Sequence, residues 1–200
     1  GHHLEPLGRP LLHDIHALII ARGNTAARAR AGASGRFDLW DDGAMAEIEL
    51  FDRRWAGTVA GWAGDADAAM LWCSLPSVTS ETVEAWADSP SVEAYVLRDA
   101  ERVAAYGEVW VDADEQEVEL AHLIVDPSQR GSGFGTQLVV SLVEQARRHY
   151  PMVALRVHSR NDIAIRCYRA AGFERVSAAE ETAWNRGQPV DYVWMTHRRA

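Results

Sequence analysis

The sequence predicts one mixed α/β domain in which helices flank a mixed sheet, and three observations support this fold class. The chain has 200 residues, 48% hydrophobic and 24% charged, which is ordinary for one globular domain with its own core. Apolar runs with strand character alternate with runs that repeat at helical spacing. Three strand-like runs follow one another without a helix, which predicts an antiparallel meander. We expect the domain to span residues 46–200.

The first 45 residues have a different character and are expected to form an extension outside this domain. Gly1-His2-His3 is typical of an affinity-tag remnant. Pro10 begins a short run with helical spacing, which Gly23 would end. The stretch 25–36, "TAARARAGASGR", is small, basic and low in complexity, which favours an arm. Such an arm is compatible with a homodimer in which it contacts the partner subunit.

The first part of the domain is expected to supply four strands and two helices. Trp55, Val59 and Trp62 lie at helical spacing, and Ser80-Glu81 places an acidic residue in a first helical turn, as the helix dipole favours. The expected elements are, in order, a strand at 46–50, helices at 52–63 and 80–87, and strands at 91–99, 102–112 and 117–126.

The second part adds two helices and three strands, which brings the sheet to seven strands. Asn161 is a good N-cap for one helix, and Gly172 stands where a helix commonly ends in a left-handed residue. The expected elements are a helix at 137–146, a strand at 151–159, a helix at 161–171 and strands at 174–182 and 190–197.

A glycine-rich loop, "QRGSGFGT" at 129–136, joins an apolar strand to the long helix. Glycines let the backbone approach a ligand closely, and amides at a helix N-terminus bind anions. The loop therefore favours a phosphate cradle, with a simple tight turn as the alternative. No Gly-Lys-Ser/Thr follows, so it is not a Walker loop, and Thr136 stands where the dinucleotide fingerprint requires glycine.

Two motifs in order resemble signatures of the GNAT superfamily of acyl-CoA-dependent N-acyltransferases. Arg130 to Gly135 is similar to its Arg/Gln-x-x-Gly-x-Gly/Ala loop, within "LIVDPSQRGSGFGTQLV" at 123–139. The later "NDIAIRCYRAAGF" at 161–173 is similar to its Asn-x-x-Ala-x-x-x-Tyr-x-x-x-Gly-Phe signature. The resemblance covers residue 46 to the end and implies a mixed, mostly antiparallel seven-stranded sheet flanked by helices.

The resemblance also implies a site for acetyl-CoA as co-substrate. In this family the loop amides hold the pyrophosphate, the strand before the loop pairs with the pantetheine arm, and an asparagine contacts that arm. That strand normally splays from the next one and leaves a V-shaped slot. The implied cofactor-binding residues are Leu123, Ile124, Val125, Arg130, Gly131, Ser132, Gly133, Phe134, Gly135, Thr136 and Asn161.

For catalysis, the resemblance implies Tyr168 as the general acid toward the departing thiolate. Glu119 stands eleven residues before Arg130, at the spacing of the catalytic glutamate in histone-type members. Glu117 and a water relay through histidine stay open as rivals for the base. Strand alternation places Glu119, Ala121 and Leu123 on one side unless a bulge intervenes. Arg156 stands where ribosomal-protein acetyltransferases carry a glutamate, which puts that substrate class in doubt.

The expected activity is transfer of an acetyl group to a primary amine, on a small molecule or a protein N-terminus, by direct attack. The alternative is a non-catalytic acyl-CoA sensor or interaction module. A net charge of −9 argues against a nucleic-acid partner, and no apolar run reaches membrane-spanning length. Two cysteines without a CxxC favour a reduced, cytoplasmic protein, and we expect no metal. Trp55, Trp62, Trp72, Trp86, Trp184 and Trp194 are candidates for the acceptor pocket, but we expect most of them to pack in the core.

Overall fold

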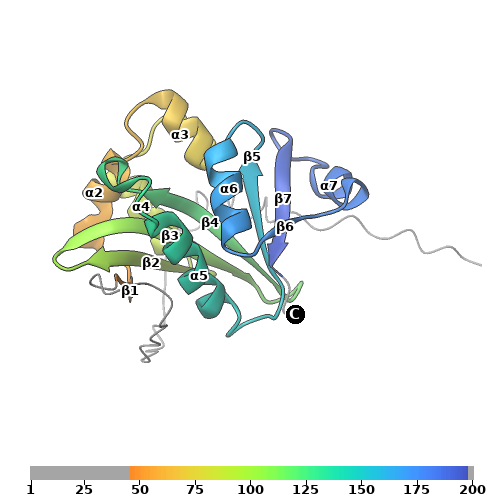
Figure 1. The fold of residues 1–200 in the computed structure, drawn as a ribbon, viewed down its shortest axis with the longest axis horizontal. Coiled ribbons are helices and arrows are strands. Elements are labelled where there is room, and N and C mark those ends of the chain that lie inside the picture. The colour runs from red at the N-terminus through yellow and green to blue at the C-terminus, as the bar shows by residue number, and fades with distance from the viewer. Residues whose placement is uncertain (1–45, 198–200) are drawn as a thin grey trace, which may run out of the picture.

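In the computed structural model, residues 46–197 are described, and they form a seven-stranded sheet with helices packed on it (Figure 1). The strand order is β1-β2-β3-β4-β5-β7-β6, and β4–β5 is the parallel neighbour pair. This confirms the fold class, and the expected extension at 1–45 lies outside the described residues. The strands are β1 Glu47–Leu50, β2 Val92–Asp99, β3 Arg102–Asp112, β4 Glu117–Val125, β5 Val153–His158, β6 Glu174–Arg175 and β7 Tyr192–His197.

The helices begin where side chains can cap free backbone amides. Thr79 and Thr82 form a capping box at α4, and Asn161 accepts from the Ala164 amide at α6. Gly172 follows α6 with φ +89°, as expected for a left-handed helix end. The helices are η1 Arg53–Trp55, α2 Ala56–Gly61, α3 Ala66–Cys73, α4 Ser80–Ala87, η2 Pro127–Gln129, α5 Phe134–Ala146, α6 Asp162–Ala170 and α7 Ala178–Trp184.

Two helices differ from the sequence expectations. No helix was expected between 63 and 80, but Asp65 caps α3 by accepting from the Ala68 amide at 2.8 Å. The predicted strand at 174–182 is wrong beyond residue 175, because Ser177 and Glu180 form a capping box that starts α7.

Hydrophobic clusters cover both faces of the sheet. Helices α5 and α6 pack on one face, where Leu138, Leu142 and Ile165 meet inward residues of β3, β4 and β5. Helices α2 and α4 pack on the other face through Val59 and Trp86. Figure 1 shows α5 and α6 side by side across the sheet, with α3 near the N-terminal end of α6.

Strands β4 and β5 pair over a short stretch and then separate. The paired residues are Val118–Leu120 on β4 and Val153–Leu155 on β5. Beyond this stretch β4 stays paired to β3, up to Val125 opposite Ala105, while its other edge is not paired with β5. The expected V-shaped slot between these strands is therefore present.

A bulge in β4 changes which side chains share a face. Register with β3 shifts between Tyr106 and Glu108, and His122 has φ +50°. Because of this extra residue, the Leu123 side chain packs in the cluster on the α5 face, although Leu123 also borders the cavity that Glu119 and His122 line. The alternation of Glu119, Ala121 and Leu123 was expected only without a bulge, and the bulge takes Leu123 off the side that Glu119 occupies. Gly107 opposite has no room for a side chain: a Cβ there would lie 2.6 Å from a Leu123 methyl carbon.

Within residues 46–197, none of the helices has the length and apolar character that crossing a membrane requires. In the same part of the chain, no three His, Cys, Asp or Glu side chains come together as a metal site would need.

Candidate active site

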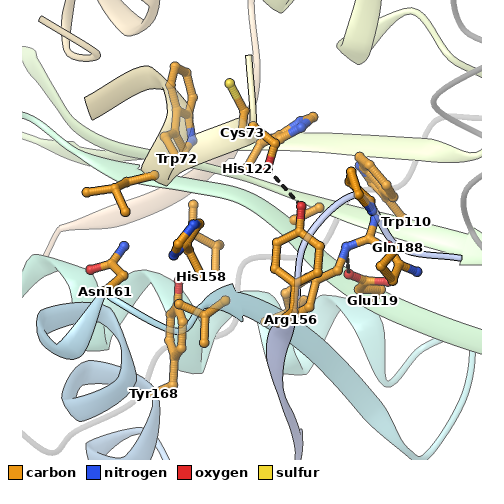
Figure 2. A pocket seen from close by; sticks show the side chains of 18 residues that line it. Trp72, Cys73, Trp110, Glu119, His122, Arg156, His158, Asn161, Tyr168 and Gln188 are labelled. Atoms are coloured by element: carbon orange, nitrogen blue, oxygen red, sulfur yellow. Dashed lines mark hydrogen bonds and ion pairs between the residues drawn. The ribbon is translucent and has the colours of Figure 1, made fainter. Parts of the chain in front are cut away.

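A cavity opens where β4 and β5 part, and residues from six helices and strands line it (Figure 2). Its walls come from the end of α3, from β3, β4 and β5, from the N-cap and the last turn of α6, and from the start of β7 with the loop that leads into it. The lining residues are Leu71, Trp72, Cys73, Ser74, Trp110, Glu119, Leu120, Ala121, His122, Leu123, Arg156, Val157, His158, Asn161, Tyr168, Gln188, Pro189 and Tyr192.

Glu119 is a buried carboxylate in the wall of this cavity. Its exposed fraction is 1%, and its Oε1 lies 3.2 Å from Nε of Arg156. Its second oxygen, Oε2, is buried and has no hydrogen-bond partner among the described residues. A buried acceptor without a partner costs about 1–3 kcal/mol, so this atom is suited to receive a donor from a ligand or water.

Arg156 is held in place from several sides. Its guanidinium lies over the rings of Trp110, Tyr192 and Trp194, at 5.9, 5.6 and 5.4 Å from their centroids. Its Nη1 donates to Oε1 of Gln188 at 3.2 Å. Arg156 stands where ribosomal-protein acetyltransferases carry a glutamate, so in this chain that position places a positively charged guanidinium beside Glu119.

A second carboxylate, Glu108, lies behind the cavity and was not singled out from the sequence. It is fully buried and accepts from the Tyr106 hydroxyl and the Trp110 indole N–H, and its Oε2 lies 2.9 Å from Nδ1 of His122. The His122 ring also stacks on Trp86, with centroids 3.7 Å apart. Burial, followed by the charge of Glu108, raises the pKa of the Tyr106 phenol well above its usual value. The network fixes the His122 ring in the cavity wall.

Tyr168 lines the cavity from α6 (Figure 2). Its exposed fraction is 8%, and burial raises the pKa of its phenol above the ordinary value near 10, with a smaller contribution from Cys167. The hydroxyl therefore keeps its proton through neutral and mildly alkaline pH. Asn161 also lines the cavity while it caps α6, so its two expected roles are compatible.

The glycine loop beyond β4 has the geometry of an anion cradle. Gly131 and Gly133 have φ of +84° and +88°, and a Cβ on either would meet no atom within 4 Å. Gly133 is the N-cap of α5 and supplies no side chain, so the amides of the first helical turn are left for another acceptor. The Ser132 amide differs, because it donates back to the Gln129 carbonyl at 3.4 Å. The loop fits a phosphate group on its open side.

The structure brings most of the predicted residues to the cavity or to the edge of β4 that leads to the loop. Leu123, Ile124 and Val125 lie where β4 is not paired with β5, and Arg130 donates to the Val125 carbonyl at 3.4 Å. The Thr136 hydroxyl, in the first turn of α5, lies 3.6 Å from the Cys167 sulfur on α6. Glu117 is not among the lining residues, whereas Glu119 is.

Most of the candidate tryptophans pack in the core, as expected. Of the six candidates, Trp72 lines the cavity, whereas Trp55, Trp62 and Trp86 pack in the α2–α4 cluster. Trp110 lines the cavity and was missed, although it stands two residues after Glu108 on one face of a strand. A lone glutamate within the apolar run "VAAYGEVWV" was the signal in the sequence that marked this face.

The family model described as "Acetyltransferase (GNAT) family" matches residues 49–173. A UPF0039 protein of Schizosaccharomyces pombe is 28% identical over 85 residues, which cover 42% of this chain and 56% of that protein. The match thus spans little more than half the length of that curated relative.

Solved structures of acetyltransferases have a similar fold. An aminoglycoside acetyltransferase, AAC(6')-Ib in complex with paromomycin and acetyl-CoA, aligns over 78% of this chain and 94% of its own, with a TM-score of 0.60 and 22% identity. Spermidine N-acetyltransferase from Vibrio cholerae, in complex with CoA and spermine, aligns over 77% and 95%, with a TM-score of 0.62 and 15% identity. At these identities the likeness concerns the fold.

Proposed function

The chain belongs to the acetyltransferase (GNAT) family, and on this premise we propose that it transfers an acetyl group from acetyl-CoA to a primary amine held in the cavity. The observation that carries the proposal is that β4 and β5 separate after Leu120. The edge of β4 that is thereby left unpaired with β5 runs from the cavity, which Tyr168 lines, toward the glycine loop. The neighbours in complex with paromomycin and with spermine hold amine-bearing ligands, which supports an amine as the acceptor.

Acetyl-CoA would supply the activated acetyl thioester. The residues suited to hold it are the loop from Gly131 to Thr136, whose open side fits the pyrophosphate, and the free edge of Leu123–Val125, which fits an extended arm. A backbone N–H on this edge would donate to the thioester carbonyl and polarise it. Asn161 and Thr136 add polar side chains along the same path.

In the chemical step, the acceptor ammonium must lose a proton before its nitrogen can attack the thioester carbonyl. Glu119 is the residue we assign to accept it, directly or through one water, because its Oε2 has no partner in the described residues. The nitrogen then forms the amide bond as the carbon–sulfur bond breaks. Tyr168, which its raised phenol pKa keeps neutral before this step, donates its proton to the departing thiolate, and the second proton of the attacking nitrogen returns to the Tyr168 oxygen through water, so that amide, neutral thiol and phenol result.

The test is a free-thiol release assay with acetyl-CoA over a panel of primary amines. We expect Tyr168→Phe and Glu119→Gln each to lower kcat by about ten- to a thousand-fold, as loss of an acid or base group typically does. Calorimetry with CoA separates binding from chemistry, because both variants keep the glycine loop. Tight CoA binding without thiol release from any amine would instead favour a non-catalytic binding module.

A further inference from the structure

The ion pair between Glu119 and Arg156 presents two opposite charges side by side in one cavity wall. The Glu119 Oε1 and Arg156 Nε atoms are 3.2 Å apart, and both residues line the cavity. Glu119 keeps Oε2 without a partner among the described residues. Such a surface is complementary to a ligand that carries an amine and a carboxylate next to each other.

Arg156 is suited to bind a carboxylate because its guanidinium is already fixed. Nε faces Glu119, Nη1 donates to Gln188 and three aromatic rings surround the group, so little side-chain entropy is lost on binding. A guanidinium has five N–H donors on three nitrogens, and the polar contacts described above within residues 46–197 involve Nε and Nη1. Its side chain is 17% exposed, which leaves donors accessible from the cavity.

The charges of the cavity do not suit a polycation. Among the described lining residues, Glu119 is the one acidic side chain, and Arg156 already offsets it. Glu108, the nearest further carboxylate, is fully buried among three donors. An acceptor with several ammonium groups would meet one paired carboxylate and a fixed cation.

We propose that the acceptor is a small zwitterion, a free α-amino acid or a molecule whose amine and carboxylate are one or two carbons apart. Its carboxylate binds Arg156 and its amine lies toward Oε2 of Glu119, the oxygen assigned to take the proton. Since that oxygen is buried, the amine reaches it through a small rotation of the Glu119 side chain or through one water. Trp72 and Tyr192 in the same walls favour a neutral side chain on the acceptor. The inference rests on the proposed function.

The experiment compares leucine with leucinamide, which keeps the amine and the size but has no carboxylate, and with spermidine as a polycation. We expect kcat/KM for leucine to exceed that for leucinamide by about ten- to a hundred-fold, the worth of one charge-assisted hydrogen-bonded contact. In Arg156→Gln this ratio should fall toward one, mainly through KM. Arg156→Lys keeps the charge but loses the planar fork and should give an intermediate ratio.

Arg160→Gln is the matched control, because it removes the same charge from an exposed residue outside the cavity lining and should keep the parent ratio. A preference for leucinamide or spermidine, or a ratio that Arg156→Gln leaves unchanged, overturns the inference. If no amine releases thiol, the proposed function fails. Calorimetry of leucine against the CoA-loaded protein then decides this inference separately, since binding that Arg156→Gln does not weaken contradicts it.

Discussion

Removing the carboxylate of Glu108 should destabilise the protein strongly, because three buried donors converge on it. Tyr106 and Trp110 donate to it, and His122 Nδ1 lies 2.9 Å from its Oε2. Leaving one buried donor unsatisfied costs about 1–3 kcal/mol. Glu108→Ala leaves three, and with partial rescue by water we expect a loss of about 3–5 kcal/mol. For a domain with about 5–15 kcal/mol of total stability, this is a large fraction.

The assay is urea unfolding followed by tryptophan fluorescence, because Trp110 and Trp86 adjoin this network. A loss of this size corresponds to a fall in Tm of about 6–20 °C for a chain of this length. Glu108→Gln keeps one acceptor oxygen and should lose about half as much. The control, Glu115→Ala, makes the same change in an exposed turn and should stay within about 0.5 kcal/mol of the parent. If Glu108→Ala unfolds within about 1 kcal/mol of the parent, the network does not have the energetic role that its geometry indicates.

Three further predictions concern packing and titration. Gly107→Ala should lower the free energy of unfolding in urea by about 1–3 kcal/mol, because its Cβ would lie 2.6 and 2.7 Å from two leucine methyl carbons. The control Gly57→Ala adds a Cβ that meets no atom within 4 Å, so it should be neutral or slightly stabilising. Burial raises the pKa of the Cys73 thiol to about 11, so iodoacetamide should alkylate it at pH 8 about a hundred-fold more slowly than in urea, and equal rates would contradict this burial. The hydrogen bond from Arg175 lowers the pKa of Glu181 below 4.5. The stability from this pair should therefore be present above about pH 4.5 and be lost as the pH falls through the lower pKa of the folded state. Glu181→Gln should flatten this dependence when the free energy of unfolding is measured from about pH 3 to 6.

The sequence was most informative where local pattern decides the structure. Strands such as 102–112 could be predicted because their apolar runs and flanking turns are local signals. Helix α3 was missed because "ADAAMLWC" is apolar on most of its circumference, so no helical period stands out. The capping box of Ser177 and Glu180 was visible in the sequence and outweighs the strand pattern that was favoured there.

The site could be predicted only in part, since its residues meet through the tertiary fold. The two motifs led to Tyr168 and Asn161, which line the cavity, and to the glycine loop that follows β4. The pairing of Glu119 with Arg156 depends on the parallel register of β4 with β5, which no local pattern encodes. The roles of these residues, the homodimer and the cellular location stay predictions.

The bulge at His122 explains why the slot and the cavity wall occur together. The last β4–β5 pair is Leu120 with Leu155, and the left-handed residue follows two positions later, so the strands part where the extra residue is inserted. In a regular strand of the same sequence, alternation would turn the Leu123 side chain away from the α5 face and leave the space opposite Gly107 unfilled. One backbone irregularity therefore coincides with a strand edge that is not paired with β5, keeps a leucine in the core and turns His122 onto Glu108. The edge and the wall have a common cause, so a substitution that removes the bulge should abolish ligand binding and the Glu108 network together.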